Sequence, residues 1–418
     1  MDTPAEAMTH LLAYGRKKLR AMSSRSYRIV SPSTNTSSAP LGSVVEFKIP
    51  GNQMAAFLDN NSMYFKFTIK NTTANNFTLE GKGAAYNFIS KLEIMTSGQT
   101  IDTISNYNLL FSTLIDTDST IAHRKNNGNI LYGSKDARAG EVIAGGAELV
   151  VCLPFLLSSI SNSRKYIPLF SRDSLQIRLT LADRVQAGIS DPTQITANTS
   201  ILVDQPELIY NVVELSADAF QAVSASVDNV FQIVSDSYRH TSANVTNATN
   251  QTLVANLGFS FSSLNRVIIV QRESALVNTQ NSPSIGNRAQ RGIVEARLLL
   301  NGASIPERPI KISTSCAEAL AELLVADRSL VAFDSQNAIN NAAASYKAVA
   351  PDGSDDANTG SFVLQIDTES MRSESDDPGI FSGAAAGSNI ACNIDFFAQY
   401  TQLLTLDMNS SQVFIASV

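Results

Sequence analysis

One short pattern of residues occurs twice in the chain, roughly half a chain apart. Lys91–Ile101 (KLEIMTSGQTI) and Glu295–Ile305 (EARLLLNGASI) each read as an apolar strand, a polar residue followed by glycine, and a second strand. The dipeptides Ser97-Gly98 and Asn301-Gly302 tolerate the positive φ angles that a two-residue hairpin turn requires. The pattern therefore predicts two hairpins in two related domains.

A helix is expected after each hairpin. The stretch Tyr107–Ile115 has a helix-like pattern after the first hairpin. After the second, Ser315 and Glu318 have the S-x-x-E spacing of a capping box, and an Ala- and Leu-rich stretch continues to about Asp327. The repeat thus consists of strand, turn, strand and helix in the same order.

The length and composition of the chain agree with two domains that assemble. At 418 residues the chain exceeds the roughly 250 to 300 residues at which one hydrophobic core stops growing. The hydrophobic content of 44% supports packed cores, while a charged content of 17% is low against a usual value of about 25%. A weakly charged surface favours contact with partners.

Most of the chain after residue 40 alternates apolar and polar residues, which is the period of strands with one face on a core. Turn-forming residues separate these segments, and the alternation of strands and helices typical of a parallel sheet is absent. The expected fold class is all-β: two consecutive antiparallel sandwiches, over residues 41–222 and 223–418, with short helices. The clearest alternating segments are Val45-Phe47-Ile49, Met63-Phe65-Phe67-Ile69 and Leu175-Ile177-Leu179-Leu181.

Long polar connections interrupt both halves. Unstructured loops of such length are uncommon inside compact domains and are usually functional or ordered by a partner. We expect several of them to project from the sandwiches as contact surfaces. They are Asp116–Gly146, Ser274–Arg291, Ser335–Gly360 and Ser370–Ser388.

Residues 1–40 form a predicted N-terminal arm that differs from the rest in charge. Apolar residues recur near helical spacing from Met8 to Met22, with basic residues largely on the other side, so a short amphipathic helix is expected. No acidic residue lies between Glu6 and Glu46, although the net charge of the whole chain is −7. Residues 31–40 are expected to be a flexible link. The basic residues of the arm are Arg16, Lys17, Lys18, Arg20, Arg25 and Arg28.

Three roles are open for this arm. A cationic segment can contact a polyanion, either nucleic acid or an anionic membrane surface. The run GRKKLR over residues 15–20 also fits a nuclear-import signal, and a helix that is merely solvated or packed at an interface needs no ligand. We take the six basic residues as the candidate site that faces a polyanion.

No catalytic, cofactor-binding or metal-binding residue is predicted. The histidines His10, His123 and His240 lie far apart, without ligands at metal-binding spacing. Acidic stretches at 116–118 and 352–356 lack the spacing of a calcium loop, and we expect both to be solvated loop tips. Cys316 begins the capped helix, but no base can be assigned to it, so a packed thiol is expected. An enzyme is therefore not expected.

The three cysteines are odd in number and widely spaced, which predicts free, buried thiols rather than a disulfide framework. They are Cys152, Cys316 and Cys392. No apolar run approaches the roughly 18 residues needed to span a bilayer, and no secretory signal is evident. We therefore expect neither a transmembrane nor a conventionally secreted protein.

The order of these segments resembles a known family. Tyr86–Asp116 is similar to the first-domain signature of double-jelly-roll major capsid proteins, and Lys165–Leu181 is similar to the closing part of that domain. The resemblance extends over about residues 41–418 and leaves the arm uncovered. The segments that resemble the second domain are Asn301–Ile310, Phe362–Asp367, Ser382-Gly383 and Phe396–Met408.

The resemblance implies a structural protein of tailless icosahedral DNA viruses of the adenovirus-like and virophage-like kind. Members form trimers whose six jelly rolls make a pseudo-hexagonal capsomer, and the capsomers tile the shell of the virion. Implied partners are other copies of the chain, minor capsid or penton proteins and, through the arm, the genome or an internal membrane. No cofactor or small-molecule substrate is implied. The alternative is a jelly-roll module, such as a viral spike or lectin, that binds a receptor or glycan.

Overall fold

The computed structural model describes most of the chain after residue 23. The described residues are 24–51, 53, 55–96, 98–135, 139–154, 157–163, 165–169, 174–189, 193–245, 252–261, 263–277, 285–300, 302–312, 315–327, 346–347, 360–368, 380–385, 392–407 and 412–417.

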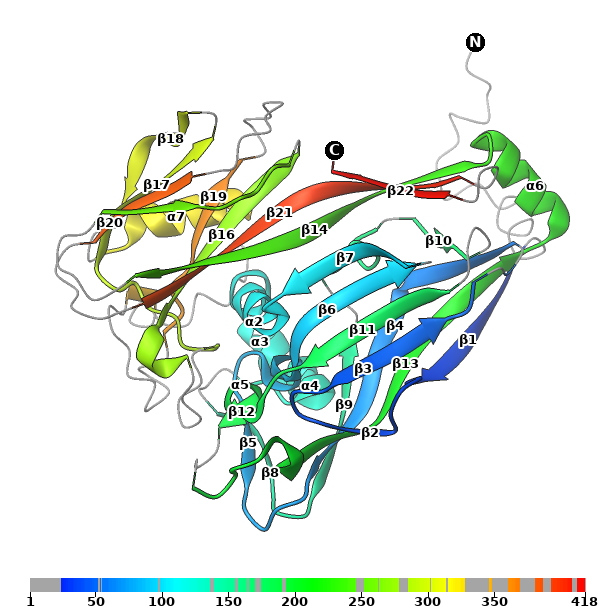
Figure 1. Cartoon of the computed structure of the whole chain (residues 1–418), viewed down its shortest axis with the longest axis horizontal. Coiled ribbons are helices and arrows are strands. Elements are labelled where there is room, and N and C mark those ends of the chain that lie inside the picture. The colour runs from blue at the N-terminus through cyan, green and yellow to red at the C-terminus, as the bar shows by residue number, and fades with distance from the viewer. Residues whose placement is uncertain are drawn as a thin grey trace.

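Two large sheets and one small sheet form the first half of the molecule (Figure 1). All pairings within them are antiparallel. The six-stranded sheet contains β1 (Ser24–Pro32), β2 (Ser38–Pro40), β4 (Ala56–Asn71), β9 (Glu148–Pro154), β10 (Ile167–Pro168) and β13 (Ile201–Leu215); the four-stranded sheet contains β3 (Val44–Ile49), β6 (Ile89–Thr96), β7 (Gln99–Ser105) and β11 (Leu175–Leu181); the small sheet contains β5 (Phe77–Glu80), β8 (Ala139–Ile143) and β12 (Gly188–Ile189).

Two further antiparallel sheets form the second half, after the helix α6 (Ala217–Ser226). In the described residues no sheet combines strands from before and after α6. The five-stranded sheet contains β14 (Val230–Val245), β16 (Leu264–Glu273), β19 (Leu364–Asp367), β21 (Cys392–Asp407) and β22 (Gln412–Ser417); the four-stranded sheet contains β15 (Thr252–Asn256), β17 (Ile293–Leu300), β18 (Ala303–Lys311) and β20 (Ile380–Ala385).

The two halves have the same strand order, which is that of a jelly roll. In the larger sheets, β1 pairs with β13, β13 with β4 and β4 with β9; the equivalent path in the second half is β14-β21-β16-β19. The four-stranded sheets run β3-β11-β6-β7 and β15-β20-β17-β18. The predicted all-β fold of two consecutive sandwiches is therefore confirmed as a double jelly roll.

The repeated sequence pattern forms equivalent hairpins in the two jelly rolls. Gly98 and Gly302 follow the strands β6 and β17 and have φ angles of 79° and 75°, which glycine adopts without strain. At equivalent positions before these turns, Ile94 and Leu298 are each fully buried. Both hairpins are confirmed as predicted; Ser97 and Asn301 lie outside the described residues.

Each hairpin leads to a helix, as expected: α2 (Tyr107–Asp118) after the first and α7 (Ala317–Ala326) after the second. The second helix begins one residue later than the predicted capping box. Cys316 is its N-cap, and Glu318 accepts the backbone N–H of Lys311 at 3.0 Å. The other short helices are η2 (Ala84–Phe88), α3 (Ile121–His123), the π-helical turn η3 (Arg124–Gly128), α4 (Asn129–Tyr132), α5 (Arg184–Ala187), η4 (Asn198–Ser200) and η5 (Ser274–Leu276).

The cores of the jelly rolls lie between their sheets. Alternate residues of β11 are buried, as the period of two predicts. Phe47 of the four-stranded sheet and Phe65 of the six-stranded sheet meet across the first core, with ring centroids 5.4 Å apart. Such a face-to-face packing excludes water from both sheets and fixes the register of each strand.

The predicted flexible link over residues 31–40 is wrong. Ser31 and Pro32 complete β1, which pairs with β13, and residues 38–40 form β2. Between the two strands, the amide of Asn35 donates to Val44 O at 2.7 Å and its oxygen accepts the N–H of Glu46 at 3.0 Å. A composition rich in Ser, Thr and Asn is therefore compatible with an ordered turn, because these side chains bond to the backbone. The limits of the arm and of both domains otherwise stay predictions, and the boundary at 222/223 falls inside α6.

The predicted loop 116–146 is also wrong, because much of it is helical. α2 continues through Asp118, and α3, η3 and α4 follow it. Tyr132 of α4 packs edge-on against Tyr86 at 5.2 Å, and Tyr86 stacks on Phe111 of α2 at 3.5 Å. These aromatic contacts hold the helical segment on the first jelly roll. In the second half, β20 lies within the predicted loop 370–388.

We predict that Ile94→Ala and Leu298→Ala each destabilise the jelly roll to which they belong. Removing a buried side chain of this size costs about 2–5 kcal/mol. Hydrogen exchange is expected to rise mainly in residues 24–215 for the first variant and mainly in 230–417 for the second. Thr100→Ala, at an exposed position of the first hairpin, is the control. Equal acceleration in both halves by either variant would contradict the equivalence of the two positions.

Candidate functional site at the junction of the two jelly rolls

A buried carboxylate lies where the two jelly rolls meet. Asp116, near the end of α2, is 2% exposed. Its Oδ1 accepts a hydrogen bond from Arg124 at 2.7 Å, and its Oδ2 lies 3.1 Å from Nζ of Lys82. Burial alone would raise the pKa of this carboxyl, but Lys82, Arg288 and Arg124 together lower the pKa to about 2. Asp116 is therefore charged at neutral pH.

The third cation comes from the second jelly roll. Arg288 is fully buried, and its Nη2 forms an ion pair with Oδ2 of Asp116. Its Nη1 also lies 3.4 Å from the carbonyl oxygen of Ser112, one turn earlier in α2. A single side chain of the second jelly roll thus contacts both the charge and the backbone of a helix of the first.

Lys82 extends the same contact. Its ammonium group donates to Gly360 O at 2.9 Å and to Ser361 Oγ at 3.0 Å, both in the second jelly roll. Burial lowers the pKa of Lys82 to about 8, against the attraction of Asp116. Gly360, whose carbonyl oxygen accepts from Lys82, also donates its backbone N–H to Asn287 Oδ1 at 2.8 Å.

Close backbone approach accompanies these ion pairs. Gly286 lies directly on the carboxylate of Glu80, so that a Cβ at this position would collide with Glu80 Oε1. The other oxygen of Glu80 accepts hydrogen bonds from the N–H of Gly83 at 2.8 Å and from Asn87 at 3.0 Å. At this point the backbone of the second jelly roll therefore lies directly against a buried side chain of the first.

A second polar contact joins β7 to the strands that pass over it (Figure 1). Asp102 of β7 accepts hydrogen bonds from Ser237 Oγ of β14 at 2.6 Å and from the N–H of Ser159 at 2.8 Å. Gln402 of β21 donates to Ile101 O at 2.9 Å. Burial raises the pKa of Asp102 despite these hydrogen bonds.

A third contact involves His240, for which no pattern in the sequence indicated a carboxylate partner. His240 Nε2 of β14 lies 2.9 Å from Asp395 Oδ1 of β21 and 3.1 Å from Asn106 Nδ2 of the first jelly roll. Arg272 donates to the other oxygen of Asp395 at 2.7 and 2.9 Å. Burial would raise the pKa of Asp395, but Arg272 and His240 lower it. Both carboxylate oxygens of Asp395 are therefore bound by side chains of the protein itself.

The three contacts are structural in character. The charged side chains of these contacts form ion pairs and hydrogen bonds with one another. Their role is therefore to fix the orientation of one jelly roll relative to the other. Among the residues that the structure describes, no three His, Cys, Asp or Glu side chains gather as a metal site. Within the same residues, no helix combines the length and apolar character needed to cross a membrane.

The structure places only two of the six predicted polyanion-facing residues. Arg16, Lys17, Lys18 and Arg20 lie outside the described residues. Arg25 and Arg28 are exposed on β1, where the alternation of a strand puts them on opposite faces. The guanidinium carbon of Arg25 lies 5.7 Å from the ring centroid of Tyr27. These two arginines therefore do not form one patch.

Other candidates of the sequence are placed as follows. Asp116 was expected at a solvated loop tip, and this expectation is wrong because α2 continues and carries it inward. His123 is exposed, whereas His10 lies outside the described residues. The cysteines are free as expected; Cys316 and Cys392 are buried and Cys152 is half-buried. Burial raises the pKa of all three thiols, so none is activated.

One signal in the sequence points to the burial of Asp116. It follows Ser112 by four positions and Leu109 by seven, so a continuing helix places all three on one face. Leu109 and Ser112 are buried. The partner Arg288 carries no comparable signal, because it is separated from Asp116 by 172 positions.

Comparison with known proteins agrees with this architecture. Residues 60–232 match a family model described as the N-terminus of the major capsid protein. Over these residues the chain is similar to the first domain of major capsid proteins, in agreement with its double-jelly-roll fold. The resemblance seen in the sequence is thereby confirmed, and this family and fold are structural rather than enzymatic. A receptor- or glycan-binding module, the alternative reading, is not favoured.

Solved capsid structures show the same fold over nearly the whole chain. The capsid protein VP54 of PBCV-1, fitted into a reconstruction of the virophage Sputnik, has a TM-score of 0.63 at 12% identity, covering 94% of this chain and 97% of that one. A Sputnik virophage chain gives 0.60 at 11% identity, with 94% and 89% covered. The Faustovirus major capsid protein gives 0.58 at 9% identity, with 91% and 90% covered. No curated protein sequence matches the chain.

We predict that Asp116→Asn destabilises this protein strongly. The substitution keeps the shape of the side chain but leaves Lys82, Arg124 and Arg288 buried without their shared counter-ion. Breaking a buried ion pair in this way costs about 3–5 kcal/mol, measurable as a lower free energy of unfolding in urea.

Asp118→Asn is the matched control, since Asp118 belongs to the same helix but its side chain is 48% exposed and lies 3.8 Å from Arg266. An exposed ion pair contributes less than about 1 kcal/mol. Similar losses in the two variants would show that the buried cluster does not stabilise the junction.

Proposed function

We propose that three copies of this capsid protein form a capsomer of pseudo-hexagonal outline and that such capsomers tile an icosahedral shell. The observation that carries the proposal is the pair of jelly rolls with one strand order, held together by a buried ionic junction. Three such pairs around a threefold axis present six similar units to their surroundings. A trimer with six similar sides can pack against neighbouring trimers in an extended hexagonal array, as a large shell requires.

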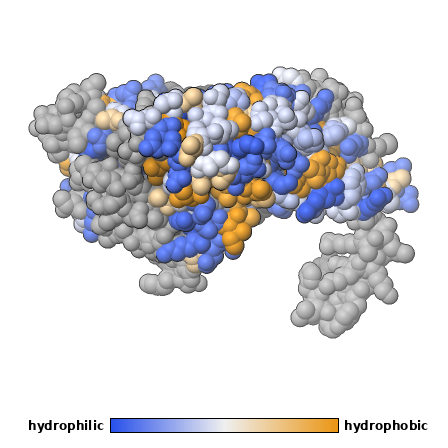
Figure 2. Space-filling model, turned by 90° about the horizontal axis from the view of Figure 1, so that it is seen from below, coloured by the Kyte–Doolittle hydropathy of each residue, from blue (hydrophilic) through white to orange (hydrophobic). Residues whose placement is uncertain are grey.

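The surface of the protein fits lateral contacts. Apolar side chains reach the surface between hydrophilic ones on the face shown in Figure 2. Val30 and Val150, both of the six-stranded sheet, are 51% and 55% exposed, and Ile130 after the first hairpin is 80% exposed. Obligate interfaces bury more than about 2,000 Å² and are rich in such residues. The charged content of 17% also lowers the desolvation free energy of burying the lateral surfaces in such an interface.

Under this proposal the protein acts in the virion after assembly inside the host cell. Its partners are copies of itself, neighbouring capsomers, and minor capsid or penton proteins at positions where the sixfold-like pattern stops. The junction between the jelly rolls then has a specific task, because a flexible pair would not present six units at fixed angles.

We predict that the purified chain is a trimer of pseudo-hexagonal outline, or forms shells, when examined by light scattering and electron microscopy. Val150→Glu is expected to shift trimers toward monomers, because it places a charge on an exposed apolar flank. Thr100→Glu, at an exposed position of the first hairpin, adds the same charge away from this sheet and is expected to leave the trimer intact. A stable monomer of the unmodified chain at micromolar concentration would contradict the proposal.

The basic arm completes the proposed function. We infer that Arg16, Lys17, Lys18 and Arg20 face the interior of the shell and contact a polyanion, either the genome or an anionic membrane. The deciding feature is the segregation of charge, since the chain is acidic overall and the arm is cationic. Because β1 begins at Ser24, Arg25 and Arg28 contribute only as flanking charges on the sheet.

We predict that binding of the trimer to single-stranded DNA weakens with salt and that changing the four arm cations to Gln reduces the slope. Each neutralised phosphate contributes about −0.7 to the log–log slope, so four cations contribute about −3. The control replaces two exposed cations of the sheets, Lys48→Gln with Arg297→Gln. Binding that is unchanged by the arm variant rejects a nucleic-acid role, and binding only to anionic vesicles assigns the arm to a membrane.

A further inference from the structure

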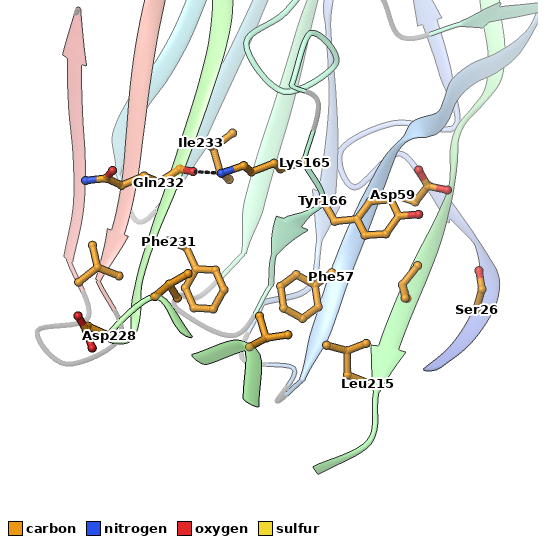
Figure 3. A pocket seen from close by; sticks show the side chains of 14 residues that line it. Ser26, Phe57, Asp59, Lys165, Tyr166, Leu215, Asp228, Phe231, Gln232 and Ile233 are labelled. Carbon is orange, nitrogen blue, oxygen red and sulfur yellow. Dashed lines mark hydrogen bonds between the residues drawn. The ribbon is translucent and has the colours of Figure 1, made fainter. Parts of the chain in front are cut away.

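An open cleft of 1180 Å³ lies beside α6, where the two jelly rolls diverge (Figure 3). One wall is formed by β4 and β13 of the first jelly roll, including Phe57 and Leu215. The other wall is the beginning of β14, including Phe231. Small-molecule sites usually have about 300–1,000 Å³, so this cleft has room for a segment of polypeptide.

The floor of the cleft is a small hydrophobic cluster separate from the main core. Phe57 lies 6.5 Å from Phe220 of α6 and 6.1 Å from Phe231, measured between ring centroids. Leu215 packs against the same cluster. The cluster therefore joins β4, α6 and β14 and gives the cleft a fixed apolar floor.

The rim of the cleft leaves apolar side chains in water. Val223, Val227 and Tyr166 are 37%, 36% and 50% exposed, and all three line the cleft. Exposed apolar residues that gather around one concave site mark a binding surface rather than a chance distribution. The cleft thus has the character of a site for an apolar segment.

The charges of the cleft are compatible with a segment that is basic overall. Two carboxylates line it, Asp59 and Asp228, against one amine, Lys165. Lys165 is directed across the cleft toward the carbonyl oxygen of Gln232, at 3.5 Å (Figure 3). The carboxylate of Asp228 lies apart from this amine, at the lower left of the view.

Residues 1–23 of the N-terminal arm join the described part of the chain next to this cleft. β1 begins at Ser24, and Ser26 of the same strand is one of the lining residues. The preceding 23 residues include the predicted amphipathic helix from Met8 to Met22. A helix of this length measures about 22 Å at 1.5 Å per residue. A short covalent tether of this kind gives the arm an effective concentration in the millimolar range at the cleft.

We propose that the cleft binds the apolar face of the chain's own N-terminal segment, residues 8–22. Met8, Leu11, Leu12 and Leu19 cover the apolar floor and rim. The cations on the opposite side of the bound segment face outward, where they stay available to a polyanion. This inference concerns one chain alone and does not depend on the assembly of a capsomer.

The natural absence of tryptophan allows a direct test. In the Leu12→Trp variant of the full chain, the single tryptophan is expected to show blue-shifted emission and slow quenching by acrylamide. Adding Val227→Asp to the cleft is expected to return both values to those of an exposed tryptophan. The matched control adds Val234→Asp, a valine of β14 that is 58% exposed and does not line the cleft, and is expected to change neither.

A cysteine pair identifies which chain supplies the segment. With Leu12→Cys and Val227→Cys in a Cys152→Ser background, oxidation is expected to give a cross-linked monomer on a non-reducing gel. Cross-linked dimers or trimers would overturn the proposal by assigning the cleft to a neighbouring copy. A tryptophan at position 12 that is exposed, or insensitive to Val227→Asp, would overturn it by showing that the arm lies elsewhere.

Discussion

The relative position of the two jelly rolls depends on the charge of Asp116. A carboxylate that is 2% exposed is tolerated only because Lys82, Arg124 and Arg288 surround it, and one of these three belongs to the other jelly roll. Each cation alone would be as costly to bury as the carboxylate. The arrangement is therefore satisfied in one orientation of the two units, and any slip between them leaves several buried charges without partners.

Local sequence signals predicted the framework of each jelly roll. The hairpin turns depend on Gly98 and Gly302, which have positive φ angles. Each glycine lies within two residues of the strands that its turn joins. The alternation of apolar and polar residues in β3 and β11 likewise indicates which face of each strand meets the core. These two strands pair antiparallel, as an antiparallel sandwich requires. Because these signals act over short distances, a single sequence was enough to predict the all-β class and the repeat.

Signals that depend on distant residues did not appear in the sequence. Asp116 was expected at a solvated loop tip. Its spacing from Leu109 and Ser112 places it on the buried face of a continuing helix, but its partner Arg288, 172 positions away, has no signal in the sequence. β1 was read as part of the arm because its arginines continue the basic run, while Tyr27 and Ile29 are too few to show a strand by themselves. Both pack against the core, and β13 supplies the neighbouring strand.

The strand β14 shows how a rigid junction and an open cleft coexist. Its middle is fixed to the first jelly roll through Ser237 and His240, whereas its beginning lines the cleft with Val230 and Phe231. Polar contacts of defined geometry give a single orientation at the cost of some stability, since ion pairs gain less from burial than apolar groups do. An apolar surface has no such directional requirement and accepts a segment whose side chains can adapt. The protein thus uses charges where the two units must not move and presents apolar side chains along the cleft.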